Sequence, residues 1–401
     1  MPFALLRPST LSRVVVLAGV GVASACQLVV GLERQRSDDE TSSPDAGPDV
    51  PVAADAGRTS PCADEPPPPP KRPVVDDHAP TITLVLSNAA FGGDDAGAAL
   101  CPSAGFDLDD RMTCIDEAGA STPSPCSTGA CASSCTPAAG ARVCDGPHGV
   151  DNAISLLVGD RGALSSLLDG RYQPSEFVTS GTANILFTIT GYNGEADDPD
   201  VSVSSYFSTG LEDRGRSRTS GDAGEPGWDG RTLRRWAIDP ASFDANGFAR
   251  LGQFPGYVSG HVLVAVGARL QIPFGPMVLD LYDGRLTGEL RRREDGLWNI
   301  AYGRVGGRVD TDQLVDVIAR APFQTGSGVV HVCEKGEAAL VSMRGFICGR
   351  ADLASDGGPE AHCNELSFGL GFTAVPAILG RLRERDVSEL GCPGQTFAGC
   401  P

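Results

Sequence analysis

The sequence predicts a mainly β protein: an antiparallel β-sandwich or barrel-like domain with a few short helices and a cysteine-rich loop insert. The first observation is a series of short apolar, β-branched runs between residues 182 and 303, separated by turn dipeptides. These dipeptides are Asn193-Gly194, Asn246-Gly247, Asp283-Gly284 and Asp295-Gly296, and the two Asp-Gly pairs are hairpin signals. The second observation is the cysteine content, which in an exported chain indicates loops held by disulfides.

Order is expected to begin near Thr81 and to continue as one disulfide-bonded domain over 81–401, with 101–148 as the cysteine-rich insert. Strands are predicted at 81–86, 182–191, 201–208, 232–238, 257–266, 268–273, 277–282, 285–291, 297–303 and 367–377. Apolar residues at helical spacing predict a glycine-broken helix over 151–168, a short helix over 311–319 and a partly helical segment over 326–346. Regular short strands with few helices are typical of sandwiches and barrels.

Residues 1–25 have the pattern of a bacterial signal peptide. Two arginines precede an uncharged run, Val14–Ala25, which is shorter than the roughly 20 residues that a membrane-spanning helix needs. Small residues then stand directly before Cys26, a pattern that predicts lipid attachment to this cysteine. Ala23-Ser24-Ala25 also suits ordinary signal peptidase, so plain secretion is the alternative.

Residues 26–80 are predicted to be a disordered tether that follows the lipidated cysteine. The segment is rich in proline and acidic residues, contains Asp-Ala-Gly units, and includes the five-proline run Pro66–Pro70. Such a composition cannot bury enough apolar surface to order itself, and the proline run should be extended polyproline II. The tether would hold the domain away from a membrane to which lipid attaches it.

The net charge of the chain argues against one class of partner, and its mean hydropathy argues against one class of protein. The net charge of −19 argues against a nucleic-acid partner, because phosphate contacts need a basic surface. A mean hydropathy close to zero argues against a polytopic membrane protein. The sequence therefore predicts a cell-envelope protein, an outer-membrane lipoprotein if Cys26 is acylated and a secreted or periplasmic protein otherwise.

Cysteine parity predicts how the disulfides are distributed. With Cys26 set aside, an even number of cysteines remains, and all are expected to form disulfides: Cys62, Cys101, Cys114, Cys126, Cys131, Cys135, Cys144, Cys333, Cys348, Cys363, Cys392 and Cys400. We expect the group over 101–144 to pair within itself and Cys62 to pair with the group over 333–400, where Cys392 and Cys400 can close a small ring. A zinc site is the alternative for Cys126 to Cys144, but the spacing matches no zinc finger.

A set of short motifs gives the chain a family resemblance. They are Gly105-Phe-Asp-Leu-Asp109, Thr113-Cys114, Val143-Cys-Asp-Gly146, Gly149-Val-Asp-Asn152 and Leu366-Ser-Phe-Gly-Leu-Gly-Phe372. Together with Cys26 and the Asp-Ala-Gly tether, they resemble putative secreted lipoproteins of unknown function from myxobacteria. The resemblance covers much of 26–153 and a patch near 363–377. It implies an exported, lipid-anchored protein, and no catalytic role is carried over with it.

Acidic residues around the cysteine-rich insert are candidate calcium ligands: Asp107, Asp109, Asp145 and Asp151. Calcium takes hard oxygen ligands of this kind. The fixed ladder of an EF-hand loop is missing, and Asp110-Arg111-Met112 stands where the resemblance leads us to expect a glycine. We therefore expect these acids to be solvated turn and capping residues that bind no calcium of consequence, and we predict no cofactor.

No motif assigns a catalytic residue. The chain lacks G-x-S-x-G and H-E-x-x-H, and its few aromatic side chains on strands are expected to fill the core. Glu289 and Glu365 stand on predicted strands, so a pair of carboxylates for glycoside cleavage stays open. The sequence favours a displayed binding or structural module over an enzyme, with an envelope protein or a polysaccharide as the expected class of partner. A secreted hydrolase acting on polysaccharide is the alternative.

Overall fold

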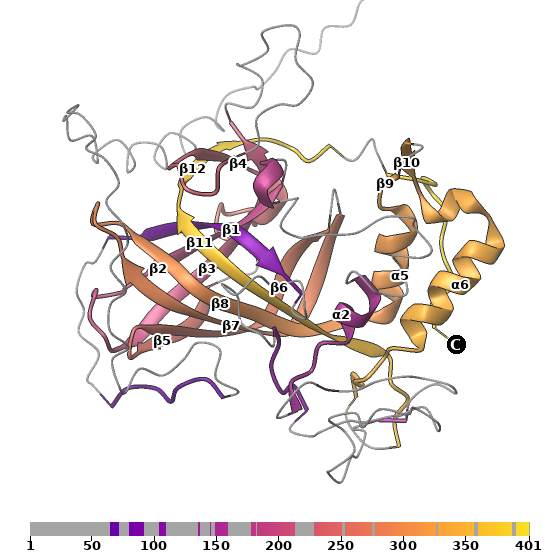
Figure 1. Cartoon of the computed structure of the whole chain (residues 1–401), viewed down its shortest axis with the longest axis horizontal. Coiled ribbons are helices and arrows are strands. Elements are labelled where there is room, and N and C mark those ends of the chain that lie inside the picture. Colours follow the sequence, from indigo (N-terminus) through magenta and orange to yellow (C-terminus); the bar gives the residue numbers. More distant parts are fainter. Residues whose placement is uncertain are drawn as a thin grey trace, which may run out of the picture. The chain divides into compact units, whose positions relative to one another are not determined.

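The computed structural model describes the parts of the chain that carry the fold and the candidate site (Figure 1). The described residues are 65–71, 80–91, 104–109, 135–136, 145, 149–158, 178–181, 183–212, 228–250, 253–274, 277–325, 328–356, 360–386 and 390–400. The predicted signal peptide, Cys26 and most of the predicted tether lie outside these residues, as do Cys62, Cys101, Cys114, Cys126, Cys131 and Cys144. No helix in the described ranges is long and apolar enough to cross a membrane.

Eight antiparallel strands close into a barrel. They are β1 (Ile82–Ala90), β2 (Asn184–Thr190), β3 (Asp198–Leu211), β5 (Phe254–Ser259), β6 (Val262–Phe274), β7 (Met277–Arg292), β8 (Trp298–Asp310) and β11 (Glu365–Pro376). Each strand pairs with the next in this order, β11 returns to β1, and the β3–β5 pairing completes the circle. The prediction of a mainly β protein is confirmed. Of the two predicted forms, a sandwich and a barrel, the strand pairings form the barrel.

Two further strands continue the sheet beside β3. β4 (Arg235–Ile238) pairs antiparallel with β3, and β12 (Ile378–Leu382) runs parallel to β4. The sheet as a whole is therefore mixed, although every pairing within the barrel is antiparallel.

Three predicted strand boundaries were wrong. The predicted break between 257–266 and 268–273 does not exist, because β6 is continuous from Val262 to Phe274. The predicted strand over 257–266 is divided by a turn at Gly260-His261, where His261 adopts a φ of 65°. Conversely, one continuous strand, β7, contains both predicted strands 277–282 and 285–291. Asp283-Gly284 is an irregularity in the pairing of β7 with β8 and not a hairpin turn. Asp283 has a φ of 51°, a left-handed conformation that aspartate tolerates better than most residues, so the same dipeptide suits either a turn or a bulge.

Apolar side chains fill the inner face of the barrel. The register line Ala265–Leu286–Val305–Leu370 crosses four strands, and residues paired in this way share a face. All four are nearly inaccessible and belong to one core cluster. Gly303 lies on the same face, where a Cβ would stand 2.6 Å from Cζ of Phe372, so large side chains are accommodated beside small ones. An eight-stranded barrel has an interior of the size that side chains can fill.

The neighbouring register line lies on the outer face and is nevertheless buried. Thr287 and Arg304 pair on this line and are each 1% exposed. The Arg304 guanidinium lies 4.4 Å from the centroid of the Phe106 ring and donates to the carbonyl of Gly105 at 3.0 Å. The segment 104–109 therefore covers this part of the outer face, and α2 (Ala153–Val158) packs beside it on β11.

Helices and the C-terminal tail form a disulfide-linked unit after β8. The predicted helix over 311–319 is confirmed as α5 (Thr311–Arg320), which begins with the Asp310 side chain accepting from the Gln313 amide. The elements that follow are β9 (Phe323–Thr325), β10 (Gly328–Val330), η5 (Val332–Lys335) and α6 (Glu337–Cys348), which confirms the partly helical prediction for 326–346.

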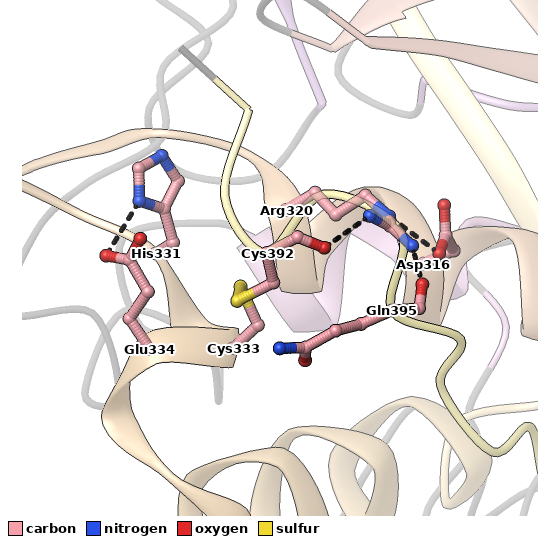
Figure 2. The surroundings of a disulfide bond; sticks show 7 residues. All are labelled: Asp316, Arg320, His331, Cys333, Glu334, Cys392 and Gln395. Carbon is pink, nitrogen blue, oxygen red and sulfur yellow. Dashed lines mark hydrogen bonds and ion pairs between the residues drawn. A yellow bond between two sulfur atoms is a disulfide. The ribbon is translucent and has the colours of Figure 1, made fainter. Parts of the chain in front are cut away.

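The disulfides do not follow the predicted partition. Cys333 pairs with Cys392 and Cys348 with Cys400, so the predicted ring between Cys392 and Cys400 is wrong. Figure 2 shows how Arg320 supports the first of these bonds, with one nitrogen donating to the Cys392 carbonyl at 2.9 Å and another paired with Asp316 at 2.8 Å.

The third disulfide joins the two predicted cysteine groups. Cys135 pairs with Cys363, although the groups were expected to stay separate. Backbone hydrogen bonds between Thr136 and the segment 361–363 bring these distant parts of the chain together. Parity counts cysteines along the sequence and does not detect such a contact.

The proline run Pro66–Pro70 differs from the rest of the predicted tether, because it has a described position in the structure. Glu65–Lys71 is placed on the barrel, and Pro67 is buried. The Tyr257 hydroxyl of β5 donates to the Pro67 carbonyl at 2.5 Å.

Candidate functional site: a buried carboxylate cluster

Five aspartates from separate segments meet on the outside of the barrel. Asp107 and Asp109 belong to the covering segment 104–109, and Asp145 belongs to the predicted cysteine-rich insert. Asp151 precedes α2, and Asp352 follows α6. Carboxylate oxygens of Asp107, Asp109 and Asp151 lie within 4.8 Å of one another. The same limit holds for Asp145, Asp151 and Asp352, so Asp151 belongs to both groups. The four candidate calcium ligands are brought together, and Asp352 is added to them.

Burial contradicts the expectation that these acids are solvated. Asp145, Asp151 and Asp352 are 6%, 1% and 2% exposed, whereas Asp107 and Asp109 are partly exposed. One reason is that the described segment 104–109 lies against β8, with the Phe106 ring over the Arg304 guanidinium. Two of the carboxylates that were predicted to be turn or capping residues are therefore enclosed by protein.

Asp151 is held by the covering segment. Its backbone amide donates to the Phe106 carbonyl at 3.0 Å, and its Oδ2 accepts from the Leu108 amide at 2.7 Å. Gly105 makes this approach possible, because a Cβ at its position would stand 2.4 Å from the Asp151 carbonyl oxygen. Its φ of 142° also disfavours other residues.

Asp352 is held by β11. Its Oδ1 accepts from the Ser367 amide at 2.8 Å, and its Oδ2 accepts from the Ser367 hydroxyl at 2.5 Å. The hydroxyl oxygen in turn accepts from the Ala153 amide at 2.7 Å, at the start of α2. Strand, helix and carboxylate are thus linked through one serine.

Asn152 fixes the relative position of the segments around the cluster. Its side-chain nitrogen donates to the carbonyls of Phe91 and Ala104 at 2.6 and 2.5 Å. Its side-chain oxygen accepts from the Gly369 amide at 3.0 Å. Three separate parts of the chain are therefore bound to one amide next to Asp151.

The environment opposes ionisation of the buried carboxyls. Burial, together with the neighbouring charges of Asp352, Asp145 and Asp109, raises the pKa of Asp151 to about 10, against the lowering effect of the Leu108 hydrogen bond. Burial raises the pKa of Asp352 to about 7, against its hydrogen bonds from Ser367. Carboxylates this close together cannot all carry charge unless something positive joins them. At neutral pH and without a cation, Asp151 therefore holds a proton.

The cluster can hold either protons or a divalent cation. Calcium takes six to eight oxygen ligands from carboxylates and carbonyls, and the residues that would supply the carboxylates here are Asp107, Asp109, Asp145, Asp151 and Asp352. Bringing together five carboxylates from at least three segments differs from an EF-hand, in which one loop supplies the ligands.

The sequence Asn193-Gly-Glu-Ala-Asp-Asp-Pro-Asp200 is a second acidic segment, and it lies between β2 and β3 and at the start of β3. Asp198 is 5% exposed, and its oxygens accept from the amides of Asn193 and Asp200 at 2.8 and 3.1 Å. Asp197 accepts from the Gly260 amide at 2.9 Å and so joins the β2–β3 loop to the β5–β6 turn. These carboxylates act as loop caps.

The two glutamates considered for glycoside cleavage each have an arginine partner. Glu289 pairs with Arg291 at 2.8 Å, and Glu365 pairs with Arg308 at 3.2 Å. The expected use of aromatics in the core is confirmed for Trp228 and Trp236, which are 5% and 0% exposed and lie 5.0 Å apart, edge to face.

Asp352 is the site residue that sequence reasoning missed. It stands more than 200 positions from Asp107 with no acidic neighbour, and it reaches the cluster because Leu353 bridges to Glu365 at the start of β11. The Asp-Leu-Ala-Ser run after a helix carries no spacing signal for a ligand. Comparison with protein-family models, with curated proteins and with solved structures finds no match.

Proposed function

We propose that the protein is a cell-envelope lipoprotein that displays a rigid barrel as a binding or structural module. The observation that carries this proposal is the inner face of the barrel, because its described side chains are mostly apolar and belong to the core. Polar chemistry lies on the outer face and in the segments that cover it. A domain of this kind presents its outer surface and loops to a partner, for which an envelope protein or a polysaccharide is the natural candidate.

The hydrolase alternative receives less support. Asp151 and Asp352 have raised pKa values, which can mark catalytic acids. Their side chains are almost fully covered, however, and a general acid must come within hydrogen-bonding reach of its substrate. Their hydrogen bonds tie covering segments to the barrel, which supports a structural role for the pair.

The lipid anchor is tested with Cys26→Ser in the full-length precursor. The wild-type protein should partition into the detergent phase of a membrane extract, because several acyl chains on one cysteine give stable anchoring. The variant should move to the aqueous phase. Cys62→Ser is the matched control, since it removes a cysteine outside the predicted attachment site and should leave the partition unchanged. Equal aqueous partition of wild type and Cys26→Ser would contradict the proposal.

A further inference from the structure

The proline run Pro66–Pro70 contacts the barrel in the way that polyproline ligands contact their receptors. Along Glu65–Lys71, Pro67 is buried and Pro66 and Pro70 are partly covered, whereas Glu65, Pro68, Pro69 and Lys71 are exposed. Polyproline II has three residues per turn, so Pro67 and Pro70 lie on the same side of the run. The burial pattern is therefore that of a polyproline helix with one face against a surface.

Tyr257 supplies the polar contact. Its hydroxyl donates to the Pro67 carbonyl at 2.5 Å, between residues 190 positions apart. Proline carbonyls in this conformation have no internal donor, so an external hydroxyl satisfies them. Burial beneath this contact also raises the pKa of Tyr257. Aromatic side chains that bind polyproline segments combine packing and hydrogen bonding in this manner.

The strand beside Tyr257 has an apolar outer face. Tyr257 pairs with Val264 and Ser259 with Val262, so these residues face the same side of the sheet. Val262 and Val264 are buried but stand outside the main core cluster, and Val266, two residues further along β6, is 51% exposed. In Figure 1 the proline segment is the violet trace below β5.

We propose that the outer face of β5 and β6 around Tyr257 is a polyproline-binding surface, which the chain's own Pro66–Pro70 occupies in cis. The docked run fixes the tether to the side of the barrel and sets the orientation in which the domain is displayed. A proline-rich segment of another protein is the class of partner that would compete for the surface. The proposal is independent of lipid attachment at Cys26.

The test uses the full chain and a synthetic peptide of Glu65–Lys71. In one variant, Pro66–Pro70 is replaced by alternating glycine and serine, which vacates the surface and leaves the barrel intact. Isothermal titration should show saturable peptide binding to this variant and none to the wild type, whose surface is occupied. A peptide with the same glycine–serine replacement should bind to neither.

The contribution of Tyr257 is tested in the vacated variant. Adding Tyr257→Phe should weaken peptide binding by about 10-fold, since it removes the hydroxyl donor and keeps the ring. Adding Tyr282→Phe is the matched control, because Tyr282 is a partly exposed tyrosine of β7, and affinity should not change. The proposal fails if the vacated variant does not bind the peptide, if Tyr257→Phe binds as tightly as its parent, or if the wild type binds as tightly as the vacated variant.

Discussion

Removing the disulfide between Cys135 and Cys363 should lower the free energy of unfolding by about 5 kcal/mol, the largest effect we expect from one cross-link. The bond joins residues that are 228 positions apart in the sequence. In the chain-entropy model, the stabilisation by a disulfide increases with the logarithm of the length of the loop that it closes. The bond also lies beside the carboxylate cluster, where Cys135 Sγ is 3.2 Å from the Asp352 carbonyl oxygen. Its loss should therefore loosen the covering segments first.

The measurement is urea unfolding of the double variant Cys135→Ser/Cys363→Ser, monitored by tryptophan fluorescence without reductant. The matched control is Cys348→Ser/Cys400→Ser, which opens a loop of 52 residues and should cost about 4 kcal/mol on the same model. The control should leave the pH dependence of stability unchanged, whereas the loss of Cys135–Cys363 should change it, because, of these two bonds, it is Cys135–Cys363 whose sulfur contacts Asp352. A cost below about 1 kcal/mol for the first pair would contradict the expected role of the bond.

The strands of the barrel could be predicted because their signal is local. Apolar, β-branched runs mark the strands, and three of the four turn dipeptides lie between consecutive strands: Asn193-Gly194, Asn246-Gly247 and Asp295-Gly296. The boundary at Gly260-His261 was missed because β-forming residues stand on both sides of it, Tyr257-Val258 before and Val262–Val266 after, and a histidine with positive φ carries no sequence signal.

The closure of the sheet into a barrel could not be predicted from local sequence signals. It depends on the β3–β5 pairing, which skips β4 and includes a register shift between Asp198 and Val201. Local alternation predicts that a strand has a buried face, but it is equally compatible with two packed sheets and with one closed sheet. The choice follows from pairings between distant segments.

The carboxylate cluster was also predictable only in part, because some of its features are local in the sequence and others arise from contacts between distant segments. Asp107, Asp109, Asp145 and Asp151 could be predicted as a group because they lie in the cysteine-rich insert or directly after it. The burial of Asp145 and Asp151 could not be predicted, because it depends on contacts between distant parts of the chain, such as Phe106 over Arg304 of β8. Sequence patterns that indicate a solvated loop and a covering loop are alike, since both are rich in glycine and aspartate.

The stability of the protein should decrease as the pH rises from about 4 to about 10 in the presence of a chelator. The folded state raises the pKa of Asp151 from 3.8 to about 10, so over this range the folded chain keeps a proton that the unfolded chain has lost. Unfolding then releases a proton, and stability falls by up to about 1.4 kcal/mol per pH unit. Asp352, with a pKa raised to about 7, adds to the slope between about pH 4 and 7.

Asp151→Asn should remove the contribution of this residue to that slope. The amide has the shape of the protonated carboxyl and never ionises, so the variant should be more stable than the wild type at pH 8 and much closer to it at pH 5. Asp356→Asn, at an exposed position, is the matched control and should follow the wild type at every pH. The measurement is the urea midpoint of each protein from pH 5 to pH 9. A wild-type stability that stays level or rises over this range would contradict a protonated Asp151.

Repeating the series with millimolar calcium separates the two ways in which the cluster can be neutralised. A divalent cation competes with the protons, so calcium binding should raise the midpoint more at pH 8 than at pH 5, and Asp151→Asn should reduce that gain because it removes a charged ligand. At a concentration 100 times the dissociation constant, the gain would be about 2.7 kcal/mol. If the calcium and chelator curves coincide, protons alone neutralise the cluster, as the absence of an EF-hand ladder led us to expect. If they separate only at high pH, the burial of Asp145, Asp151 and Asp352 has created a cation site that the spacing of the acids along the sequence does not reveal.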